Sequence, residues 1–301
     1  MTSIAATTNS QQPDYDVLII GAGVCGIYML HRMLGEGVNV TVLEVSDGPG
    51  GTWYHNRYPG ARFDSESYTY GYSFSKEILE EWSWSEHFAG QPETLEYLNF
   101  VVDKLKLSSH IQFGCKVKAA TFVDGGNYWK IETEDGRTLT TRYLLTAIGL
   151  LSAPTMPKID GVDSFGGESF HTYYAPHEPV GYEGKKVAVI GTGATGVQII
   201  SEIADKVSDL TVFQRRPNWC APLQNRPINE DEQKKIKSSY DDIFGRCGET
   251  PGGFIHGPDP RPYSEVSGKE RLEFWEELYK SPGFGVWLGN FVDVLVNESA
   301  N

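Results

Sequence analysis

The sequence lacks several features that would define its class at once. No apolar run approaches the roughly 18 residues that a membrane-spanning helix needs. Residues 1–13 contain neither Lys nor Arg, so we expect no secretory signal and interpret this segment as a disordered tail. Cys25, Cys115, Cys220 and Cys247 lie far apart and form no Cys-x-x-Cys pair. This spacing argues against a redox or metal site and predicts reduced thiols in the cytoplasm.

Basic residues are scarce as well. The 301-residue chain has 26 Lys and Arg against 40 Asp and Glu, which gives a formal net charge of −14. A protein of this sign repels phosphate backbones, so we expect no nucleic acid partner. The 40% hydrophobic share and the mean hydropathy of −0.35 instead predict a soluble protein with a packed core and no membrane partner, and the length predicts about two domains.

Glycine is in excess, with 33 residues, and its positions are informative. A buried strand is predicted over residues 16–20, a helix over 27–34 and a second strand over 38–44. The motif GAGVCG fills positions 21–26 between the first strand and the helix, and Glu44 ends the second strand. A strand, glycine turn, helix, strand and terminal acid in this order are typical of a dinucleotide-binding unit.

Each residue of this first unit has a physical role. Gly21 permits the tight turn, Gly23 lets the backbone approach a pyrophosphate, and Gly26 allows the helix to pack closely on the strand. The N-terminus of the helix offers N–H groups to phosphates, and Glu44 can accept hydrogen bonds from ribose hydroxyls. The alternative is a glycine-rich turn without a ligand, which the complete strand–helix–strand context makes less favoured.

The pattern recurs later in the chain. A strand is predicted over 187–190, a helix over 197–204 and a further strand over 210–214. The turn of this second unit consists of Gly191, Thr192, Gly193, Ala194, Thr195 and Gly196. Arg215 and Arg216 stand where the first unit has its acid. Because a guanidinium can pair with a 2′-phosphate, this site suits NADPH, whereas the first suits a cofactor with free ribose hydroxyls. The alternative for the two arginines is an exposed loop pair.

The remaining chain is mixed in pattern. Thr94 is expected to cap a helix that continues to Leu105. Strands are predicted over 111–117, 119–124, 127–133 and 138–148. Residues 153–184 have no period and are rich in Pro, Gly and aromatic residues, so we interpret them as a linker. After Gln214, helical stretches are predicted over 230–247, 268–280 and 285–297.

Two further stretches carry a resemblance to a known family. Residues 50–64 read GGTWYHNRYPGARFD, and residues 165–171 read FGGESFH. Together with the two glycine turns, they resemble type I Baeyer–Villiger monooxygenases, which are class B flavoprotein monooxygenases, from about Asp14 to Asn301. The linker motif of that family, Phe-x-Gly-x-x-x-His-x-x-x-Trp-Pro, keeps Pro176 here but has Ala175 in place of the Trp. We expect the neighbouring Tyr173 and Tyr174 to fill part of that space.

The resemblance implies an α/β fold with two Rossmann-like, doubly wound dinucleotide-binding domains. An FAD domain would span 14–152, and an NADPH domain with a helical insertion would span 185–301. Such enzymes use NADPH and O2 to convert a ketone to an ester or lactone by way of a flavin peroxide. The family's catalytic arginine and the later strands of both domains have no counterpart here. We therefore expect a fragment, whose partner is the missing C-terminal half of the same enzyme.

The resemblance also assigns residues. FAD would be held by Gly21, Gly23, Gly26, Glu44, Gly51, Thr52, Trp53, Asp64 and Tyr70. NADPH would be held by Arg62, Gly191, Thr192, Gly193, Ala194, Thr195, Gly196, Arg215 and Arg216. Asp64 would orient the arginine that this chain lacks, and Phe165, Gly167 and His171 would form the hinge of the linker.

Several alternatives stay open. Asp64 can instead cap a loop turn, and His171 can be a structural hydrogen-bonding residue. For the whole chain, the alternatives are a flavin monooxygenase that oxygenates nitrogen or sulfur, and a catalytically inert module that binds FAD and NADPH.

Overall fold

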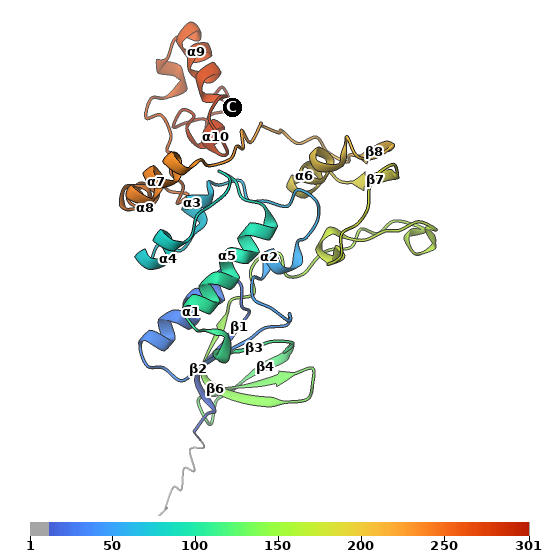
Figure 1. The fold of residues 1–301 in the computed structure, drawn as a ribbon, viewed down its shortest axis with the longest axis vertical. Helices are drawn as coiled ribbons and strands as arrows, with labels where there is room; N and C mark the ends of the chain where they lie inside the picture. Colours follow the sequence, from blue (N-terminus) through green and yellow to red (C-terminus); the bar gives the residue numbers. More distant parts are fainter. Residues whose placement is uncertain (1–11, 301) are drawn as a thin grey trace, which may run out of the picture. The chain divides into compact units, whose positions relative to one another are not determined.

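A computed structural model describes residues 12–300 (Figure 1). The predicted disordered tail, residues 1–13, lies outside the described residues except for its last two. The chain forms two compact units. Unit 1 consists of the residues up to 57 together with 95–177, and unit 2 consists of 58–94 together with the residues from 178 onward. None of the described helices is long and apolar enough to cross a membrane.

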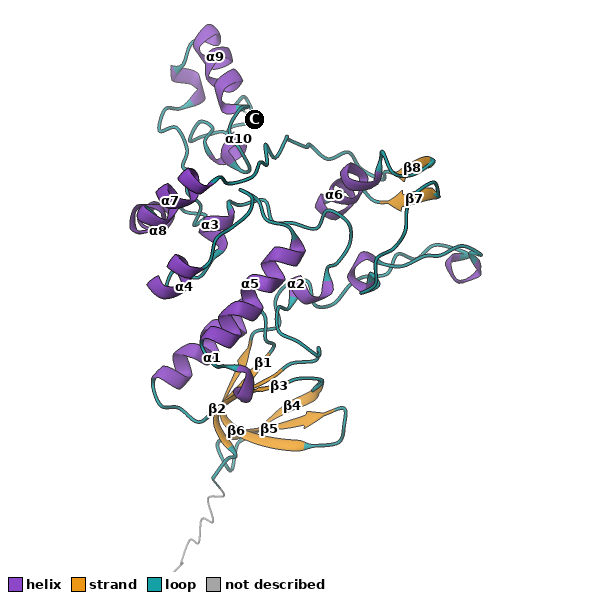
Figure 2. Ribbon diagram, in the orientation of Figure 1, coloured by secondary structure: helices purple, strands orange, loops and turns teal. Residues whose placement is uncertain are grey.

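Unit 1 is built on a six-stranded sheet in the order β3-β2-β1-β6-β5-β4 (Figure 2). Its strands are β1 (Tyr15–Ile20), β2 (Val40–Leu43), β3 (Ile111–Gln112), β4 (Val117–Val123), β5 (Tyr128–Thr133) and β6 (Thr138–Thr146). Strand β1 pairs in parallel with β2 and β6, whereas β4, β5 and β6 form an antiparallel meander. All of β2 and the centre of β1 are buried, as parallel strands covered on both faces require.

The helices of unit 1 follow from the glycine turn and from apolar periodicity. They are α1 (Val24–Gly35), α2 (Thr52–His55), most of α5 (Gln91–Lys104), and the 3-10 helices η1 (Ser108–His110), η2 (Val162–Ser164) and η3 (Thr172–Tyr174). Helix α1 buries Gly26, Ile27 and Leu30, three positions on one face. The first βαβ unit that the sequence predicts is therefore present.

Two local predictions, one in each unit, are wrong. Thr94 does not cap a helix, because α5 already begins at Gln91, where Pro92 suits the first turn; the Thr94 hydroxyl donates to the carbonyl of Gly90 inside the helix. The strand predicted over 111–117 stops at Gln112. Gly114 has a φ of 62°, which an extended strand cannot continue, and the chain turns there before β4.

Unit 2 contains the second βαβ unit and a set of short helices. Its parallel strands are β7 (Lys186–Ile190) and β8 (Asp209–Phe213), with α6 (Ala194–Ile203) between them. The other helices are α3 (Ser67–Tyr70), α4 (Lys76–Glu81), α7 (Glu230–Ser238), α8 (Tyr240–Glu249), α9 (Gly268–Leu278), α10 (Gly285–Leu288) and the 3-10 helix η4 (Tyr263–Glu265). The predicted α/β class, with two βαβ units, is confirmed.

The helices predicted after the second βαβ unit form only in part. The stretch 230–247 is two helices that meet at Ser239. The helix predicted over 285–297 ends at Leu288. The Asn290 side chain then accepts hydrogen bonds from Phe291 N at 2.9 Å and from Trp275 Nε1 at 3.1 Å, which redirects the chain. Phe291 pairs with Asp259 in an isolated bridge instead of continuing a helix.

Residues 58–94 lie within the FAD domain predicted over 14–152 but pack in unit 2. Phe88 N donates to Asn225 Oδ1 at 3.0 Å, and Ile228 N donates to Ser85 O at 2.8 Å. These hydrogen bonds join segments about 140 residues apart, so no local sequence pattern indicates them. The compact units describe packing within the chain, and the predicted nucleotide-binding boundaries, with the linker 153–184, stay predictions.

Candidate dinucleotide sites

The turn between β1 and α1 has a shape that only glycine allows. Gly21 has a φ of 101°, and a Cβ there would lie 2.6 Å from the carbonyl oxygen of Ala147. A Cβ on Gly26 would lie 1.9 Å from the carbonyl oxygen of Gly21. The tight turn and the close helix–strand packing that the sequence predicts are therefore both present. Helix α1 begins at Val24 with Gly23 as its N-cap and no side-chain cap, an arrangement suited to an anionic group.

The start of the 50–64 motif packs directly on this turn. Gly50 N donates to Ala22 O at 2.9 Å. A Cβ on Gly51, which has a φ of 56°, would lie 2.9 Å from the Cα of Gly23. Glycines on both segments thus leave a backbone-lined cradle that a methyl group would fill. The cradle fits the pyrophosphate of a dinucleotide, which needs close backbone approach.

Glu44 is buried beneath the same turn. Its side chain accepts hydrogen bonds from Ala22 N at 2.6 Å and from Ser46 N at 2.8 Å, one on each carboxylate oxygen. The residue is only 4% exposed. Because each carboxylate oxygen has a second lone pair, Glu44 can hold the turn and still accept from a ribose hydroxyl. The sequence indicates the second role but not the first.

The 50–64 motif continues into a small cluster of polar and aromatic side chains in unit 1. Trp53 is buried, and the Thr52 hydroxyl accepts from Asn56 Nδ2 at 2.8 Å. His55 Nε2 lies 3.0 Å from Ser46 Oγ, and its ring stacks on Tyr173 with centroids 4.9 Å apart. Burial lowers the pKa of His55. Sequence reasoning missed Ser46 and His55, although His55 stands within the quoted motif.

The residues predicted as the hinge are also in unit 1. His171 accepts a hydrogen bond from Tyr173 N at 3.1 Å and caps the short η3 helix, which is the structural role left open above. Phe165 is 65% exposed. A Cβ on Gly167 would lie 2.6 Å from the ring of Phe165, so this glycine permits the ring to fold back. Ala175 is buried. The hinge function itself stays a prediction.

The second glycine turn repeats the first. Gly191 has a φ of 108°, and a Cβ on Gly196 would lie 2.3 Å from the Gly191 carbonyl oxygen. A Cβ on Gly193, the N-cap of α6, would meet nothing within 4 Å. The backbone at Gly193 is therefore open to a ligand. The Thr192 hydroxyl accepts from Gln214 Nε2 at 3.1 Å.

The two arginines that follow β8 lie on this exposed side of unit 2. The Thr192 hydroxyl donates to Arg216 O at 3.3 Å, which fixes the backbone of the arginine pair relative to the turn. Both Arg215 and Arg216 are exposed to solvent. Exposed guanidinium groups beside the turn are able to meet a phosphate on the 2′ position of a bound nucleotide.

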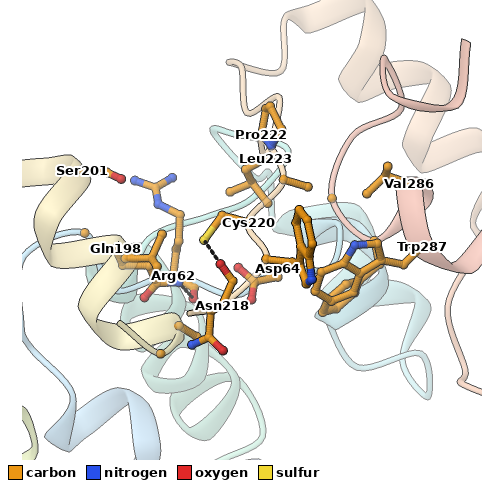
Figure 3. A pocket seen from close by; sticks show the side chains of 18 of the residues that line it. Arg62, Asp64, Gln198, Ser201, Asn218, Cys220, Pro222, Leu223, Val286 and Trp287 are labelled. Atoms are coloured by element: carbon orange, nitrogen blue, oxygen red, sulfur yellow. Dashed lines mark hydrogen bonds between the residues drawn. The ribbon is translucent and has the colours of Figure 1, made fainter. Parts of the chain in front are cut away.

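A cavity of about 850 Å³ opens beside this turn within unit 2 (Figure 3). Its lining includes Arg62, Asp64, Thr192, Gly193, Gln198, Ser201, Cys220, Leu223, Val286 and Trp287. The volume falls within the range of small-molecule sites, roughly 300–1,000 Å³. Polar groups on one wall face apolar side chains on the other, as a site for an organic ligand requires.

Asp64 and Arg62 lie on the polar wall of this cavity. Burial raises the pKa of the Asp64 carboxyl, while a hydrogen bond from Gln198 and the charge of Arg62 offset part of that rise. Arg62 Nη1 donates to Glu86 Oε2 at 3.1 Å and to Phe88 O at 3.0 Å. Arg62 lines the same cavity as Thr192 and Gly193 of the second glycine turn, and its role toward NADPH stays a prediction.

The predicted FAD residues are divided between the units. The glycines, Glu44, Thr52 and Trp53 belong to unit 1, whereas Asp64 and Tyr70 belong to unit 2. Tyr70 stacks on Phe63 with ring centroids 4.4 Å apart. No unit brings the whole predicted FAD set together by itself, so the roles of Asp64 and Tyr70 toward FAD stay predictions.

One residue of the cavity wall makes long-range contacts, and the sequence does not single it out. Gln198, on α6, donates from Nε2 to the carbonyl oxygen of Arg62 at 2.9 Å. Its Oε1 accepts from the hydroxyl of Tyr58 at 2.9 Å. These contacts join residues 136 and 140 positions apart, which is why no motif or spacing points to them.

Comparisons with known proteins agree with this geometry. Residues 18–243 match the family model described as pyridine nucleotide-disulphide oxidoreductase. The chain is 44% identical, over 98% of its length and 55% of the relative, to 2-oxo-Δ3-4,5,5-trimethylcyclopentenylacetyl-CoA monooxygenase of Pseudomonas putida. It is 38% identical, over 97% of its length and 54% of the relative, to cyclohexanone 1,2-monooxygenase of an Acinetobacter species. It is 37% identical to phenazine N-monooxygenase PhzNO1 of Lysobacter antibioticus, over 97% of this chain and 54% of that one.

Solved structures give the same result. A crystal structure of OTEMO in complex with FAD and NADP has a TM-score of 0.94 and 44% identity, covering 97% of this chain and 56% of that one. Cyclohexanone monooxygenase bound to ε-caprolactone has a TM-score of 0.93 and 40% identity, covering 95% and 56% of the two chains. The chain spans about half the length of the curated relatives it matches. The chain belongs to the pyridine nucleotide-disulphide oxidoreductase family, and along nearly its whole length it is similar to Baeyer–Villiger monooxygenases.

Proposed function

We propose that this chain provides the FAD- and NADPH-binding part of a monooxygenase that converts ketones to esters or lactones by Baeyer–Villiger oxidation. The observation that carries the proposal is the pair of glycine turns, one followed by a buried acid and the other by two exposed arginines. The named relatives support it, since they include a cyclohexanone 1,2-monooxygenase.

The first turn would bind FAD, which supplies the oxygen-activating chemistry when bound. Gly21, Gly23 and Gly26 shape the backbone for the pyrophosphate, and Glu44 accepts from the ribose. Gly51 extends the cradle, and Thr52 and Trp53 continue from it in the short helix α2. This chain's part is to bind and orient the cofactor and to exclude water from it.

The second turn would bind NADPH, the source of the reducing hydride. Gly191, Gly193 and Gly196 shape the turn, and the N-terminus of α6 faces the phosphates. Thr192, Ala194 and Thr195 complete it. Arg215 and Arg216 would pair with the 2′-phosphate and so favour NADPH over NADH. Arg62 would add a further cationic contact from the cavity wall.

Asp64 is the carboxylate that we assign to the reaction. We propose that it orients an arginine supplied by the remaining part of the enzyme, as the resemblance implies. Its place on the wall of the 850 Å³ cavity, half-buried beside Arg62, supports this role. A ketone and O2 are the proposed substrates, with Phe165, Gly167 and His171 as the hinge of the linker. The missing C-terminal half is the proposed partner, and no nucleic acid is involved.

A second candidate function is oxygenation of nitrogen. It rests on the 37% identity to a phenazine N-monooxygenase, which covers the chain as completely as the ketone monooxygenases do. A third is an inert module that binds both dinucleotides. A cytoplasmic location is also a proposal, which the four cysteines support because they form no disulfide.

Product analysis separates these functions. The chain is incubated with FAD, NADPH, 18O2 and cyclohexanone, alone and together with the C-terminal half of a related monooxygenase, and the products are analysed by mass spectrometry. A lactone with one 18O atom in its ring supports the proposal. An N-oxide formed from an added phenazine, without lactone, supports the second candidate. Binding of both dinucleotides without any product in either mixture supports the inert module.

A further inference from the structure

Gln198 joins the 58–64 loop through its amide group, which also has a hydrogen bond with Asp64. Its nitrogen donates to the backbone oxygen of Arg62, and its oxygen accepts from the hydroxyl of Tyr58, both at 2.9 Å. Burial raises the pKa of Tyr58, so its hydroxyl stays protonated and remains a donor. An amide is the neutral side chain that donates and accepts at once, which is what these two partners require.

The same face of α6 receives the loop 58–64 closely. A Cβ on Gly60, which has a φ of 77°, would lie 2.7 Å from Gln198 O and 3.2 Å from the Cβ of Glu202. Tyr58 also has a hydrogen bond with Thr195, one turn earlier on the helix. Gly60 therefore contacts the backbone of α6 directly. The Gln198 amide bonds the residues on either side of Gly60, Tyr58 and Arg62.

This clamp controls where two functional side chains lie. Arg62 and Asp64 both stand on the cavity wall at the C-terminal side of Gly60, and Figure 3 shows Gln198 beside Arg62. The helix that carries Gln198 is the one whose N-terminus forms the second glycine turn. The loop and the turn are thereby connected through one helix and one amide.

We propose that Gln198 is a positioning residue of the nicotinamide nucleotide site. Its amide clamps the 58–64 loop onto α6 and so fixes the backbone of Arg62 beside the second glycine turn, while Glu86 and the carbonyl of Phe88 hold the guanidinium. This role rests on the proposed binding of NADPH at that turn. Gln198 acts through Arg62 and does not itself need to touch the nucleotide.

The test measures NADPH affinity of the full chain by tryptophan-to-nicotinamide energy transfer. Gln198→Leu removes the hydrogen bonds to Arg62, Tyr58 and Asp64. Gln198→Glu keeps the size of the side chain but cannot donate to the Arg62 carbonyl. Both should weaken NADPH binding about tenfold, the effect of losing about one buried hydrogen bond. Gln233→Leu is the matched control, because the side-chain amide of Gln233, on α7, makes no hydrogen bond with any described residue. The NADPH affinity of this variant should equal that of the wild type.

A double-mutant cycle tests whether Gln198 acts through Arg62. In an Arg62→Ala background, Gln198→Leu should change the dissociation constant less than about twofold, since the positioned group is gone. A tenfold loss in both backgrounds would overturn the proposal, because Gln198 would then act by another route. An unchanged affinity in Gln198→Leu alone would overturn it as well.

A second measurement is independent of NADPH. Ala61 N donates to Tyr58 O at 3.1 Å within the clamped loop. Amide hydrogen exchange over residues 58–64 should be faster in Gln198→Leu than in the wild type and unchanged in Gln233→Leu. Equal exchange in wild type and Gln198→Leu would refute the clamp. If the wild type fails to bind NADPH but shows this difference, the proposed function fails while the clamp stands.

Discussion

We expect the same substitution, Gly to Ala, to affect different properties at two glycines of the second turn, namely NADPH binding at one and folding stability at the other. A Cβ on Gly193 meets nothing within 4 Å, and its φ of −73° suits any residue. A Cβ on Gly196 would lie 2.3 Å from a backbone oxygen of the same turn. Gly193→Ala should therefore fold normally and lose NADPH, whereas Gly196→Ala should lose stability. The contrast separates a glycine needed by the ligand from one needed by the fold.

The magnitudes follow from the contacts. At Gly196 the methyl must displace backbone, which costs roughly 1–3 kcal/mol, while the better helix propensity of Ala returns about 1 kcal/mol. We expect a net loss of up to about 2 kcal/mol in the free energy of unfolding. At Gly193 the gain from a less flexible unfolded chain, about 0.4–1 kcal/mol, is offset by the poorer N-cap, so stability should change by less than about 0.5 kcal/mol.

The assay combines urea unfolding with NADPH binding on the same variants. Gly193→Ala should keep its unfolding midpoint and bind NADPH at least about tenfold more weakly, because the methyl stands where the pyrophosphate approaches the backbone. If Gly193→Ala binds NADPH as the wild type does, the turn does not hold a pyrophosphate and the reasoning is refuted.

Three further predictions concern other residues of the two sites. Arg215→Ala should weaken NADPH binding far more than NADH binding, and an equal loss of both in parallel titrations would contradict the 2′-phosphate assignment. Glu44→Gln places an amide where Ala22 N and Ser46 N both donate, so urea unfolding should show a loss of about 1.5–3 kcal/mol together with weaker FAD binding; unchanged FAD affinity would remove Glu44 from that site. Burial lowers the pKa of His55 below its ordinary 6.5. As pH falls, the His55 imidazole is therefore protonated in the unfolded chain before it is protonated in the folded chain. The free energy of unfolding should fall as pH falls below about 6.5, less steeply in His55→Phe than in wild type, and identical pH profiles would contradict this.

The sequence predicts the glycine turns well because their geometry is local. Gly21 and Gly26 sit within six residues of each other, and the clash that a Cβ would cause arises inside that segment or against the neighbouring strand. In the second turn, a Cβ on Gly196 would meet the Gly191 carbonyl oxygen within the same segment, and Gly191 has a φ of 108°. A strand, a turn and a helix in direct succession leave a pattern that can be read without knowing the rest of the fold.

The contacts that the sequence does not reveal are long-range or depend on single side chains. Gln198 meets Tyr58 and Arg62 from 136 or more positions away, and nothing in their spacing indicates it. The segment 285–297 has the apolar period of a helix, but the Asn290 side chain accepts a hydrogen bond from Phe291 N, and the helix does not continue past this point. Apolar period alone cannot register such a competing hydrogen bond.

If this chain holds FAD at its first glycine turn, the cofactor should stay with the purified protein. The most direct measurement is the visible absorption spectrum of the purified 301-residue chain after incubation with FAD and gel filtration. We predict flavin absorption bands that elute with the protein at about one FAD per chain. A folded but colourless protein would contradict it.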